Sequence, residues 1–311
     1  MYEKYFKINR EKIESRIKEI SKDFPETVLI DTVSYCNLKC SMCPHVNMKR
    51  KMGFMKWELY EKIINEISLN KKDVRIWMTF FGEGFIIKNI DEYVKYAKDK
   101  GLKDVVMNSN GNLINEKNAK KIISAGLDTL YVGIDAFTQE TYSKFRVGGD
   151  LEAVVKNVIM YKEMLSRYGN KNQKIFVQYV VMEENKKELD SFIEFWKERD
   201  ISIKIRPMVS WGGKVNANNL KNEHNDRLPC FWAMNTINIA DDGKVCLCSV
   251  DLDCAVEMGD INKQTIKEVW NTSLKEFRDK HINGRFNELP EFCKNCMDWQ
   301  SGYADYIENE D

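Results

Sequence analysis

The chain has 311 residues, about two domains' worth of sequence and enough to bury a substantial core. Lys plus Arg and Asp plus Glu both number 48, and this balance disfavours nucleic-acid binding, which usually needs a basic excess. No apolar run approaches the roughly 18 residues that span a bilayer, and the charged start MYEKYFKINREK is not a signal peptide, so we expect a soluble cytoplasmic protein without a membrane partner.

The nine cysteines are the unusual feature of the composition. Their number is odd and the sequence has no secretory signal, so metal ligation or redox chemistry is a better expectation than a disulfide framework. Three of them fall between residues 36 and 43 and six between 230 and 296. This distribution predicts two separate cysteine sites.

From residue 27 to about 208, short β-rich runs alternate with amphipathic helical patterns, which is typical of βα units and a parallel sheet. The predicted strands are 27–35, 74–81, 104–110, 129–135, 174–182 and 202–208. The clearest helical pattern covers 151–165, and Gly101, Gly126 and Gly169 are interpreted as helix C-caps. We therefore expect an α/β fold, a partial (β/α)6 TIM-like barrel, in preference to a flat sheet.

The rest of the chain predicts two flanking parts. Residues 1–26 carry an apolar helical face and are expected to pack on the barrel, within a first domain of residues 1–208. Residues 209–229 are rich in Gly and Asn without periodicity, which favours a boundary there and a second, smaller domain at 209–311.

The second domain predicts a hairpin followed by a helix. Residues 235–248 are expected to turn at Asp242-Gly243, a strong two-residue hairpin signal. Residues 265–281 predict one helix, and 293–296 a loop.

The first cysteine group has the spacing C-x3-C-x2-C, formed by Cys36, Cys40 and Cys43 directly after the first strand. Barrels place their chemistry at this edge of the sheet. Three thiolates can hold three irons of a [4Fe–4S] cluster and leave the fourth iron open to substrate or cofactor. The alternatives are a zinc site completed by His45, or an electron-transfer cluster completed by a distant cysteine.

This spacing after the first strand of a partial barrel resembles the radical S-adenosylmethionine (SAM) enzymes, and the resemblance covers roughly residues 27–208. FFGEGF at 80–85 occupies the place of the family's GGEP segment, and its Gly82 and Glu83 match that segment. The resemblance implies that Glu83 accepts from the SAM amino group and that Gly82 leaves room for the methionine moiety. An ordinary strand-to-helix turn is the alternative.

Further positions agree with the family pattern. Asn110, in a turn similar to the family's TNG, is expected to face the cofactor, and Asn185 fits loosely. Asp135 and Arg146 match a stretch that follows the fourth strand, where Arg146 would hold the SAM carboxylate or form an ordinary salt bridge. Gly133 replaces the usual Ser of this stretch, and Met42 replaces the usual aromatic residue between the last two signature cysteines.

The resemblance also implies a mechanism. Reduction of the cluster passes one electron into the SAM sulfonium and releases methionine and a 5′-deoxyadenosyl radical, which abstracts hydrogen from an unactivated C–H. An external one-electron reductant such as flavodoxin or ferredoxin is the expected partner.

The second cysteine group has a Cys, a hairpin carrying G-x4-C, a helix and a closing C-x2-C. This order resembles the twitch type of auxiliary-cluster domain, a shorter relative of the SPASM domain, over about 230–296. The resemblance implies that Cys230, Cys248, Cys293 and Cys296 ligate an auxiliary [4Fe–4S] cluster. A structural zinc ribbon is the alternative.

Three further residues have open roles. Cys246 could substitute as a ligand, and Cys254 could be a spare ligand, a hydrogen-atom donor to a substrate radical or, as we favour, a buried small residue. Arg206, at the end of the sixth strand, is expected to contact the substrate at best, because arginine is rarely unprotonated.

The leading functional hypothesis is a radical SAM oxidoreductase that acts on a small polar alcohol, such as a sugar or aminocyclitol, with the auxiliary cluster accepting an electron, binding substrate or supporting the fold. It rests on size, because about 26 residues before the first strand are too few for a peptide-recognition domain. The alternatives are a peptide maturase that epimerises or crosslinks, and a non-catalytic metal-stapled binding module.

Overall fold

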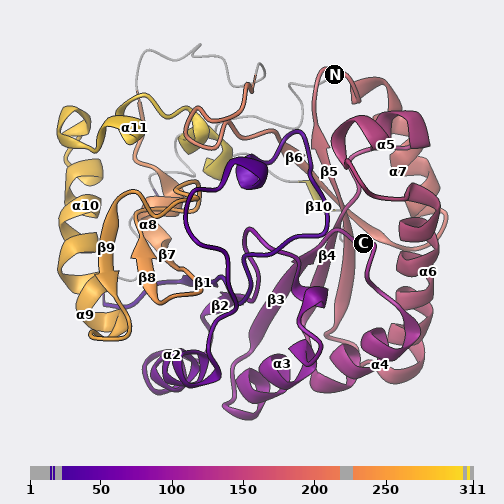
Figure 1. Ribbon diagram of the computed structural model, residues 1–311, viewed down its shortest axis with the longest axis horizontal. Helices are drawn as coiled ribbons and strands as arrows, with labels where there is room; N and C mark the ends of the chain where they lie inside the picture. The colour runs from indigo at the N-terminus through magenta and orange to yellow at the C-terminus, as the bar shows by residue number, and fades with distance from the viewer. Residues whose placement is uncertain (1–14, 16, 18–22, 218–226, 304–306, 309–311) are drawn as a thin grey trace.

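The chain forms one continuous mixed sheet in a computed structural model that describes residues 15, 17, 23–217, 227–303 and 307–308. The strand order is β10-β6-β5-β4-β3-β2-β1-β7-β8-β9 (Figure 1). The six central parallel strands are β1 (Thr27–Ile30), β2 (Arg75–Trp77), β3 (Asp104–Ser109), β4 (Thr129–Gly133), β5 (Lys174–Val181) and β6 (Ser202–Pro207). Each lies within a range predicted from the sequence, and the expectation of a parallel α/β fold is confirmed.

Helices cover the outer face of these strands (Figure 1). They are α2 (Trp57–Asn70), α3 (Ile90–Asp99), α4 (Glu116–Ala125), α5 (Gln139–Phe145), α6 (Leu151–Tyr168) and α7 (Leu189–Lys197). In α6, Asp150 caps the amino end by accepting from the Ala153 N–H, and the predicted apolar stripe is buried. Short 3-10 turns lie at η2 (Pro44–Asn47), η3 (Gly84–Ile86) and η4 (Lys186–Glu188).

The predicted C-cap glycines follow their helices in two ways. Gly101 and Gly126 have φ of 83° and 91° after α3 and α4, a backbone conformation that other residues avoid. Gly169 ends α6 with a φ of −84° in an extended conformation. Other residues adopt this conformation, so the backbone does not require glycine there.

Successive residues of each barrel strand point to opposite faces, which separates the core from the interior. Val105 and Met107 of β3 belong to the main core under the helices. On the inner face, Trp77, Tyr131 and Phe176 form a stack with ring centroids 5.3 and 5.2 Å apart. This stack lies between a cavity at the carboxyl ends of the strands and another at their amino ends, where β3, β4 and β5 begin. Barrel enzymes place their chemistry at the carboxyl ends.

The C-terminal elements extend the barrel sheet beside β1, on the left of Figure 1. Strand β7 (Thr236–Ile239) pairs with β1 in parallel, and the predicted hairpin to β8 (Lys244–Cys246) turns at Gly243, whose φ is 92°. Strand β9 (Glu257–Asp260) follows β8, and β10 (Ile307–Glu308) pairs with β6 at the opposite edge. The remaining elements are α8 (Phe231–Asn235), η5 (Phe286–Glu288), α11 (Glu291–Lys294) and η6 (Asp298–Tyr303).

The single helix predicted for 265–281 is wrong, because the chain forms two helices, α9 (Ile266–Asn271) and α10 (Ser273–Ile282), separated at Thr272. Thr272 has a φ of −115° and a ψ of −99°, outside the helical region. The Glu66 carboxylate of α2 accepts from the first two N–H groups of α9 and holds it against the barrel. Tertiary contacts therefore override a continuous helical pattern.

Two other expectations are neither confirmed nor contradicted. The helix expected near residues 1–26 lies almost entirely outside the described residues. The boundary near residue 208 stays a prediction.

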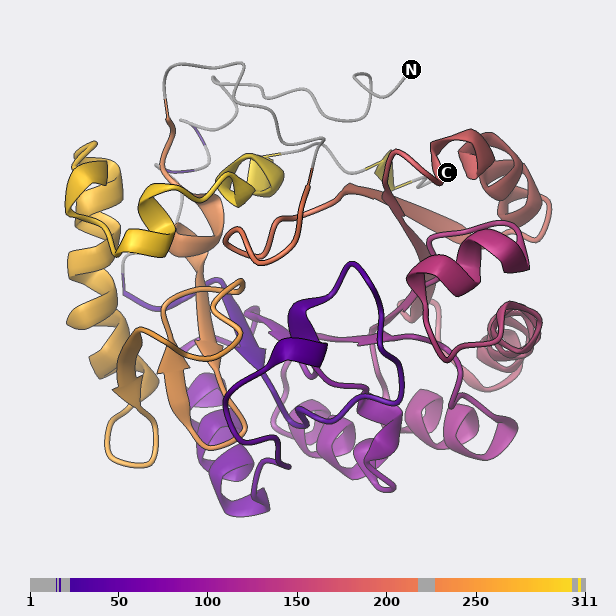
Figure 2. The ribbon, with the colours of Figure 1, turned by 45° about the horizontal axis from the view of Figure 1, so that its top comes forward.

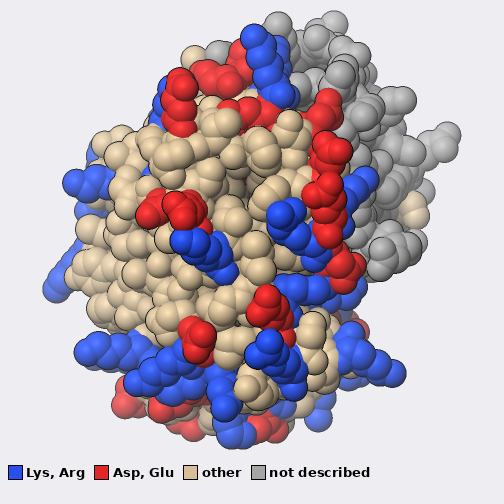
Figure 3. Space-filling view, turned by 90° about the vertical axis from the view of Figure 1, so that its right-hand side faces the viewer, with Lys and Arg blue, Asp and Glu red and all other residues tan. Residues whose placement is uncertain are grey.

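The charges on the visible surface agree with the balanced numbers of acidic and basic residues. On the face shown in Figure 3, positive and negative side chains are intermixed. Within the part of the chain that the structure describes, no helix combines the length and apolarity that crossing a membrane requires.

Candidate active site and auxiliary cysteine site

Cys36, Cys40 and Cys43 lie in the loop between β1 and α2, above the carboxyl ends of the barrel strands. In Figure 2 this indigo segment lies between the orange C-terminal elements and the magenta half of the barrel. The three cysteines line one cavity together with predicted site residues from other strand ends, namely Gly82, Glu83, Asn110, Asp135, Arg146 and Arg206. The structure thus brings together all predicted residues of the first site except Asn185.

Gly82 is constrained by the protein's own backbone. A Cβ there would lie 2.0 Å from the Val33 carbonyl oxygen and 2.8 Å from that of Tyr35. The next residue, Glu83, donates its N–H to the Tyr35 carbonyl at 2.9 Å. The glycine therefore lets the β2 end pack against the segment that leads into Cys36, a role that the sequence interpretation did not include.

Glu83 is buried and connects two strand ends. Its carboxylate accepts from the Ser109 hydroxyl at 2.9 Å, the Asn110 N–H at 2.7 Å and the Phe85 N–H at 3.1 Å. Burial raises the pKa of Glu83, and these hydrogen bonds oppose that rise. The side chain is therefore held rigidly at the cavity wall.

The two predicted asparagines differ in position. The Asn110 amide donates to the Asn37 carboxamide oxygen at 2.8 Å and lies 3.9 Å from the Cys36 sulfur, so it contacts the cysteine loop. Asn185 is fully buried away from the cavity, and its amide donates to the carbonyls of Asp135 and Val180. Its predicted contact with SAM stays a prediction, while its visible role is to fix the backbone at Asp135.

Asp135 and Arg146 form a buried ion pair beside Cys40. The Arg146 Nε donates to Asp135 at 2.8 Å, and its Nη1 lies 3.7 Å from the Cys40 sulfur. Burial disfavours the charged guanidinium, but Asp135 and Cys40 outweigh it and raise the pKa of Arg146. A Cβ at Gly133 would lie 2.2 Å from Arg146 Nη2, so the glycine in place of the family's Ser gives the guanidinium its room.

Arg206 lines the same cavity from β6. Its Nη1 donates to the Gln178 carboxamide oxygen at 3.0 Å, and the Gln178 amide donates to Asn108 at 2.9 Å. The polar row runs across the strands because Gly133, paired with Gln178 in register, has no side chain to block it. Gln178 and Asn108 were not identified from the sequence.

Trp211 closes one wall of the cavity and was also missed. Its indole N–H donates to the Met42 carbonyl at 2.9 Å, and its ring lies 5.5 Å from that of Phe81. The Asp298 carboxylate accepts from the backbone N–H groups of Ser210 and Gly212, on either side of Trp211. Nothing local in the Gly- and Asn-rich sequence around Trp211 signals this role, because its partners lie far away along the chain.

The second cysteine group is assembled from four segments. Cys230 precedes α8, Cys248 follows β8, Cys293 lies in α11, and Cys296 follows it. Burial raises the pKa of Cys230 to about 12 and raises that of Cys248, with the other three cysteines adding to the shift at Cys248. The four thiols are therefore neighbours in a buried site.

Two further side chains border this second site. Arg227 Nη2 lies 3.6 Å from the Cys293 sulfur. His281 is buried, its Nδ1 accepts from the Cys230 N–H at 3.4 Å, and its Nε2 has no partner among the described residues. Burial lowers the pKa of His281 to about 3, so the ring is neutral at physiological pH.

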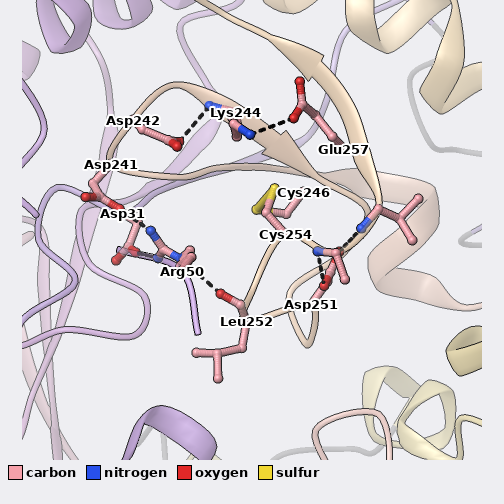
Figure 4. Close-up of a disulfide and its surroundings, with 12 residues drawn as sticks. Asp31, Arg50, Asp241, Asp242, Lys244, Cys246, Asp251, Leu252, Cys254 and Glu257 are labelled. Carbon is pink, nitrogen blue, oxygen red and sulfur yellow. Dashed lines mark hydrogen bonds and ion pairs between the residues drawn. A yellow bond between two sulfur atoms is a disulfide. The ribbon is translucent and has the colours of Figure 1, made fainter. Parts of the chain in front are cut away.

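Cys246 and Cys254 are joined by a disulfide next to this site (Figure 4). The pairing leaves seven free cysteines, which are the seven predicted cluster ligands. A hydrogen-atom donor role for Cys254 requires the reduced thiol and stays a prediction.

Arg50 connects the first cysteine loop to the C-terminal elements (Figure 4). Its guanidinium forms ion pairs with both Asp31 and Asp241, and its Nε donates to the Leu252 carbonyl at 3.0 Å. Burial raises the pKa of Asp31 to about 6, although Arg50 opposes the rise. This connection fixes the two cysteine regions relative to each other.

The donor sets fit iron–sulfur clusters better than zinc. His45 is not among the described residues that line the cavity with Cys36, Cys40 and Cys43, and its ring Nε2 lies 2.7 Å from the Ser34 carbonyl. Across the described ranges, no group of three or more His, Cys, Asp or Glu side chains is arranged around a single metal ion. Three thiols beside an open cavity suit a cubane with one free iron, and four suit a fully ligated one.

A parallel barrel with three cysteines above its carboxyl edge and four more beside it defines an iron–sulfur enzyme of the α/β class. Residues 30–195 match the Radical SAM superfamily, and residues 230–297 match the SPASM iron-sulfur cluster-binding domain. The chain belongs to the Radical SAM superfamily. The two matches imply SAM and [4Fe–4S] clusters, including an auxiliary cluster.

Individual proteins are similar to this chain over different extents. A probable GTP 3′,8-cyclase of Methanococcus maripaludis is 32% identical over 125 residues, which cover 40% of this chain and 41% of that protein. The S-adenosyl-L-methionine-dependent 2-deoxy-scyllo-inosamine dehydrogenase of Niallia circulans is 22% identical over 276 residues, covering 86% of this chain and 90% of that protein. The structure of Streptococcus suis SuiB bound to precursor peptide SuiA is similar with a TM-score of 0.67 and 14% identity, covering 86% and 70% of the two chains.

Proposed function

We propose that this protein is a radical SAM dehydrogenase that oxidises a secondary alcohol of a small polar molecule, such as a sugar or an aminocyclitol. When bound, SAM and the clusters supply the radical that removes one hydrogen atom from the carbon and the acceptor that takes one electron. A proton leaves the hydroxyl to complete the oxidation to a ketone. A flavodoxin or ferredoxin is the proposed external reductant.

The position of the second cysteine site relative to the cavity carries this proposal. Phe80 and Phe81 line the cavity that holds Cys36, Cys40 and Cys43. The same two phenylalanines also line a small second cavity, together with the predicted auxiliary ligand Cys248. An electron acceptor must lie close to the substrate radical, and these two shared side chains bring the second cysteine site next to the cavity of the first.

The chain's own residues have complementary tasks in this proposal. The Arg206 guanidinium offers N–H donors and no acceptor, so it orients an oxygen of the substrate and does not act as a base. Gln178 and Asn108 fix the direction of Arg206 through hydrogen bonds. Trp211 and Phe81 form an apolar wall that keeps water from a radical.

The extents of the similarities support a dehydrogenase. The alignment with the M. maripaludis cyclase covers only about two fifths of either chain. The alignment with the N. circulans dehydrogenase covers nine tenths of that protein and 86% of this chain.

Anaerobic turnover with defined probes tests the proposal. The reconstituted enzyme, SAM and dithionite are mixed with 2-deoxy-scyllo-inosamine and a panel of sugars deuterated at their secondary carbinol positions. We expect 5′-deoxyadenosine that carries deuterium and a ketone that has lost two hydrogens. A candidate peptide that gains one solvent deuterium at an inverted carbon, with no alcohol oxidised, would establish a peptide maturase instead.

Two variants separate binding from electron transfer in that assay. Arg206→Lys should raise KM about tenfold or more, because the planar fork that contacts an oxygen is lost while the charge remains. The paired Cys293→Ala, Cys296→Ala variant should still form 5′-deoxyadenosine but should lose the ketone.

A further inference from the structure

Arg227 lies against the auxiliary site without belonging to the predicted ligand set. Its Nη1 donates to the Lys294 carbonyl at 2.7 Å, and its Nη2 lies 3.6 Å from the sulfur of Cys293. The guanidinium carbon lies 5.1 Å from the centre of the Phe286 ring. These contacts anchor the group at three sides and direct one N–H toward a ligand sulfur.

The Nε of Arg227 has an unsatisfied donor. The atom is buried and has no hydrogen-bond partner among the described residues. Buried N–H groups in proteins almost always have an acceptor, so the site lacks one here. The sulfur atoms of a bound cluster are acceptors of the required kind.

The charge of Arg227 is also uncompensated locally. Its described side-chain contacts are with the Lys294 carbonyl, the Cys293 sulfur and the Phe286 ring, and no carboxylate among the described residues forms an ion pair with it. Asp298 lies near Cys296, where burial and then Asp298 raise the pKa of the thiol. Both oxygens of Asp298 accept backbone hydrogen bonds, from Ser210 and Gly212. Arg227 thus brings a fixed positive charge to the edge of the site.

We propose that Arg227 is a positioning residue of the auxiliary cluster, whose guanidinium donates hydrogen bonds to cluster sulfur and raises the reduction potential. Reduction adds one negative charge, which a nearby cation and N–H donors stabilise. A higher potential makes the cluster a better electron acceptor. The inference concerns the free enzyme and does not depend on which substrate is oxidised.

A potentiometric titration of the holoenzyme, followed by electron paramagnetic resonance, tests this proposal without substrate. Added SAM identifies the signal of the three-cysteine cluster, since that cluster alone has an open iron, and the remaining signal belongs to the auxiliary cluster. In Arg227→Gln we expect the equilibrium constant for one-electron reduction of the auxiliary cluster to fall about tenfold, which lowers its reduction potential by about 59 mV. Arg227→Lys should shift the potential in the same direction by less.

Arg285 provides the matched control. It lies in the same region, on the surface, and pairs with Glu288 at 3.0 Å. Arg285→Gln should leave the potential unchanged. An unshifted potential in an Arg227→Gln protein with full iron content overturns the proposal. If the Arg227→Gln protein loses iron, the Arg227→Lys protein decides the test. An unshifted potential in Arg227→Lys then overturns the proposal, because lysine cannot reproduce the fork of donors.

Discussion

The two cysteine sites differ in how they are built and in how their nearby arginines are balanced. The first takes its ligands from eight consecutive residues, 36–43, whereas the second collects them from segments spread over 230–296. Arg146, beside Cys40, is paired with buried Asp135. Arg227, beside Cys293, has no such partner among the described residues.

The contrast follows from what each site must do. The first site keeps one iron open and binds a charged cofactor, so its own charges are paired and rigid before the cofactor arrives. In the proposed assignment four thiolates close the second site, and the cation of Arg227 favours addition of an electron there. The same contact between a guanidinium and a sulfur thus has different consequences in the two places.

The largest effects should come from removing ligands one site at a time. The triple variant Cys36→Ala, Cys40→Ala, Cys43→Ala should lose about four of about eight irons and all SAM cleavage. The pair Cys293→Ala, Cys296→Ala should also lose about four irons but retain SAM cleavage. Anaerobic iron quantification and a dithionite-dependent cleavage assay measure both, and loss of SAM cleavage in the second variant would contradict the division of roles.

Breaking the Asp135–Arg146 pair should have the next largest effect. Arg146→Met leaves Asp135 buried and unpaired, which should reduce the free energy of unfolding by about 3–5 kcal/mol. Adding Asp135→Asn should restore part of that loss. Urea titration under anaerobic conditions measures both changes.

Lys144 provides the control for this pair, because it forms an exposed ion pair with Glu140 one turn away. Lys144→Met should leave the free energy of unfolding almost unchanged, because solvent screens an exposed pair. If Arg146→Met is no more damaging than Lys144→Met, the buried pair is not the stabilising feature of the first site.

The same contrast explains which parts could be predicted from sequence. The strands and the first cysteine loop depend on local pattern, because alternation and the C-x3-C-x2-C spacing are written within a few residues. Trp211 and Arg227 depend on partners about 170 and 66 residues away, so no local pattern identifies them. The break at Thr272 likewise has no local signal, because no Gly or Pro lies between Ile266 and Ile282.

Gly82 shows a subtler limit. The motif singles out a position that tolerates no side chain, and the space for a cofactor that it implies there stays a prediction. A Cβ at Gly82 would meet the Val33 carbonyl, which follows strand β1. A motif can therefore mark a residue without stating which neighbour constrains it.

Asp31, which joins the two regions through Arg50, should give a smaller, pH-dependent effect. Its pKa is raised from 3.8 to about 6 by burial, so the folded state binds the proton more tightly than the unfolded state. The stabilisation that comes from this tighter proton binding is complete below about pH 4 and is lost as the pH rises through about 6. Its upper bound in the free energy of unfolding is about 3 kcal/mol. Urea midpoints between pH 5 and 7.5 should fall less in Asp31→Asn than in the unmodified protein, and parallel curves would contradict the shift.

The smallest effect should come from Trp211, whose indole N–H bonds to the Met42 carbonyl inside the first cysteine loop. Trp211→Phe keeps an aromatic ring beside Phe81 and removes only that hydrogen bond, at a cost of about 0.5–1.5 kcal/mol. Hydrogen exchange should become faster at residues 40–43. Trp57→Phe, which alters a ring cluster with Tyr93 and Tyr96 on the outer helices, should leave exchange at 40–43 unchanged. Equal exchange at 40–43 in both variants would show that the loop is held by its own contacts, and that the link from the second site through Trp211 does not stabilise the first.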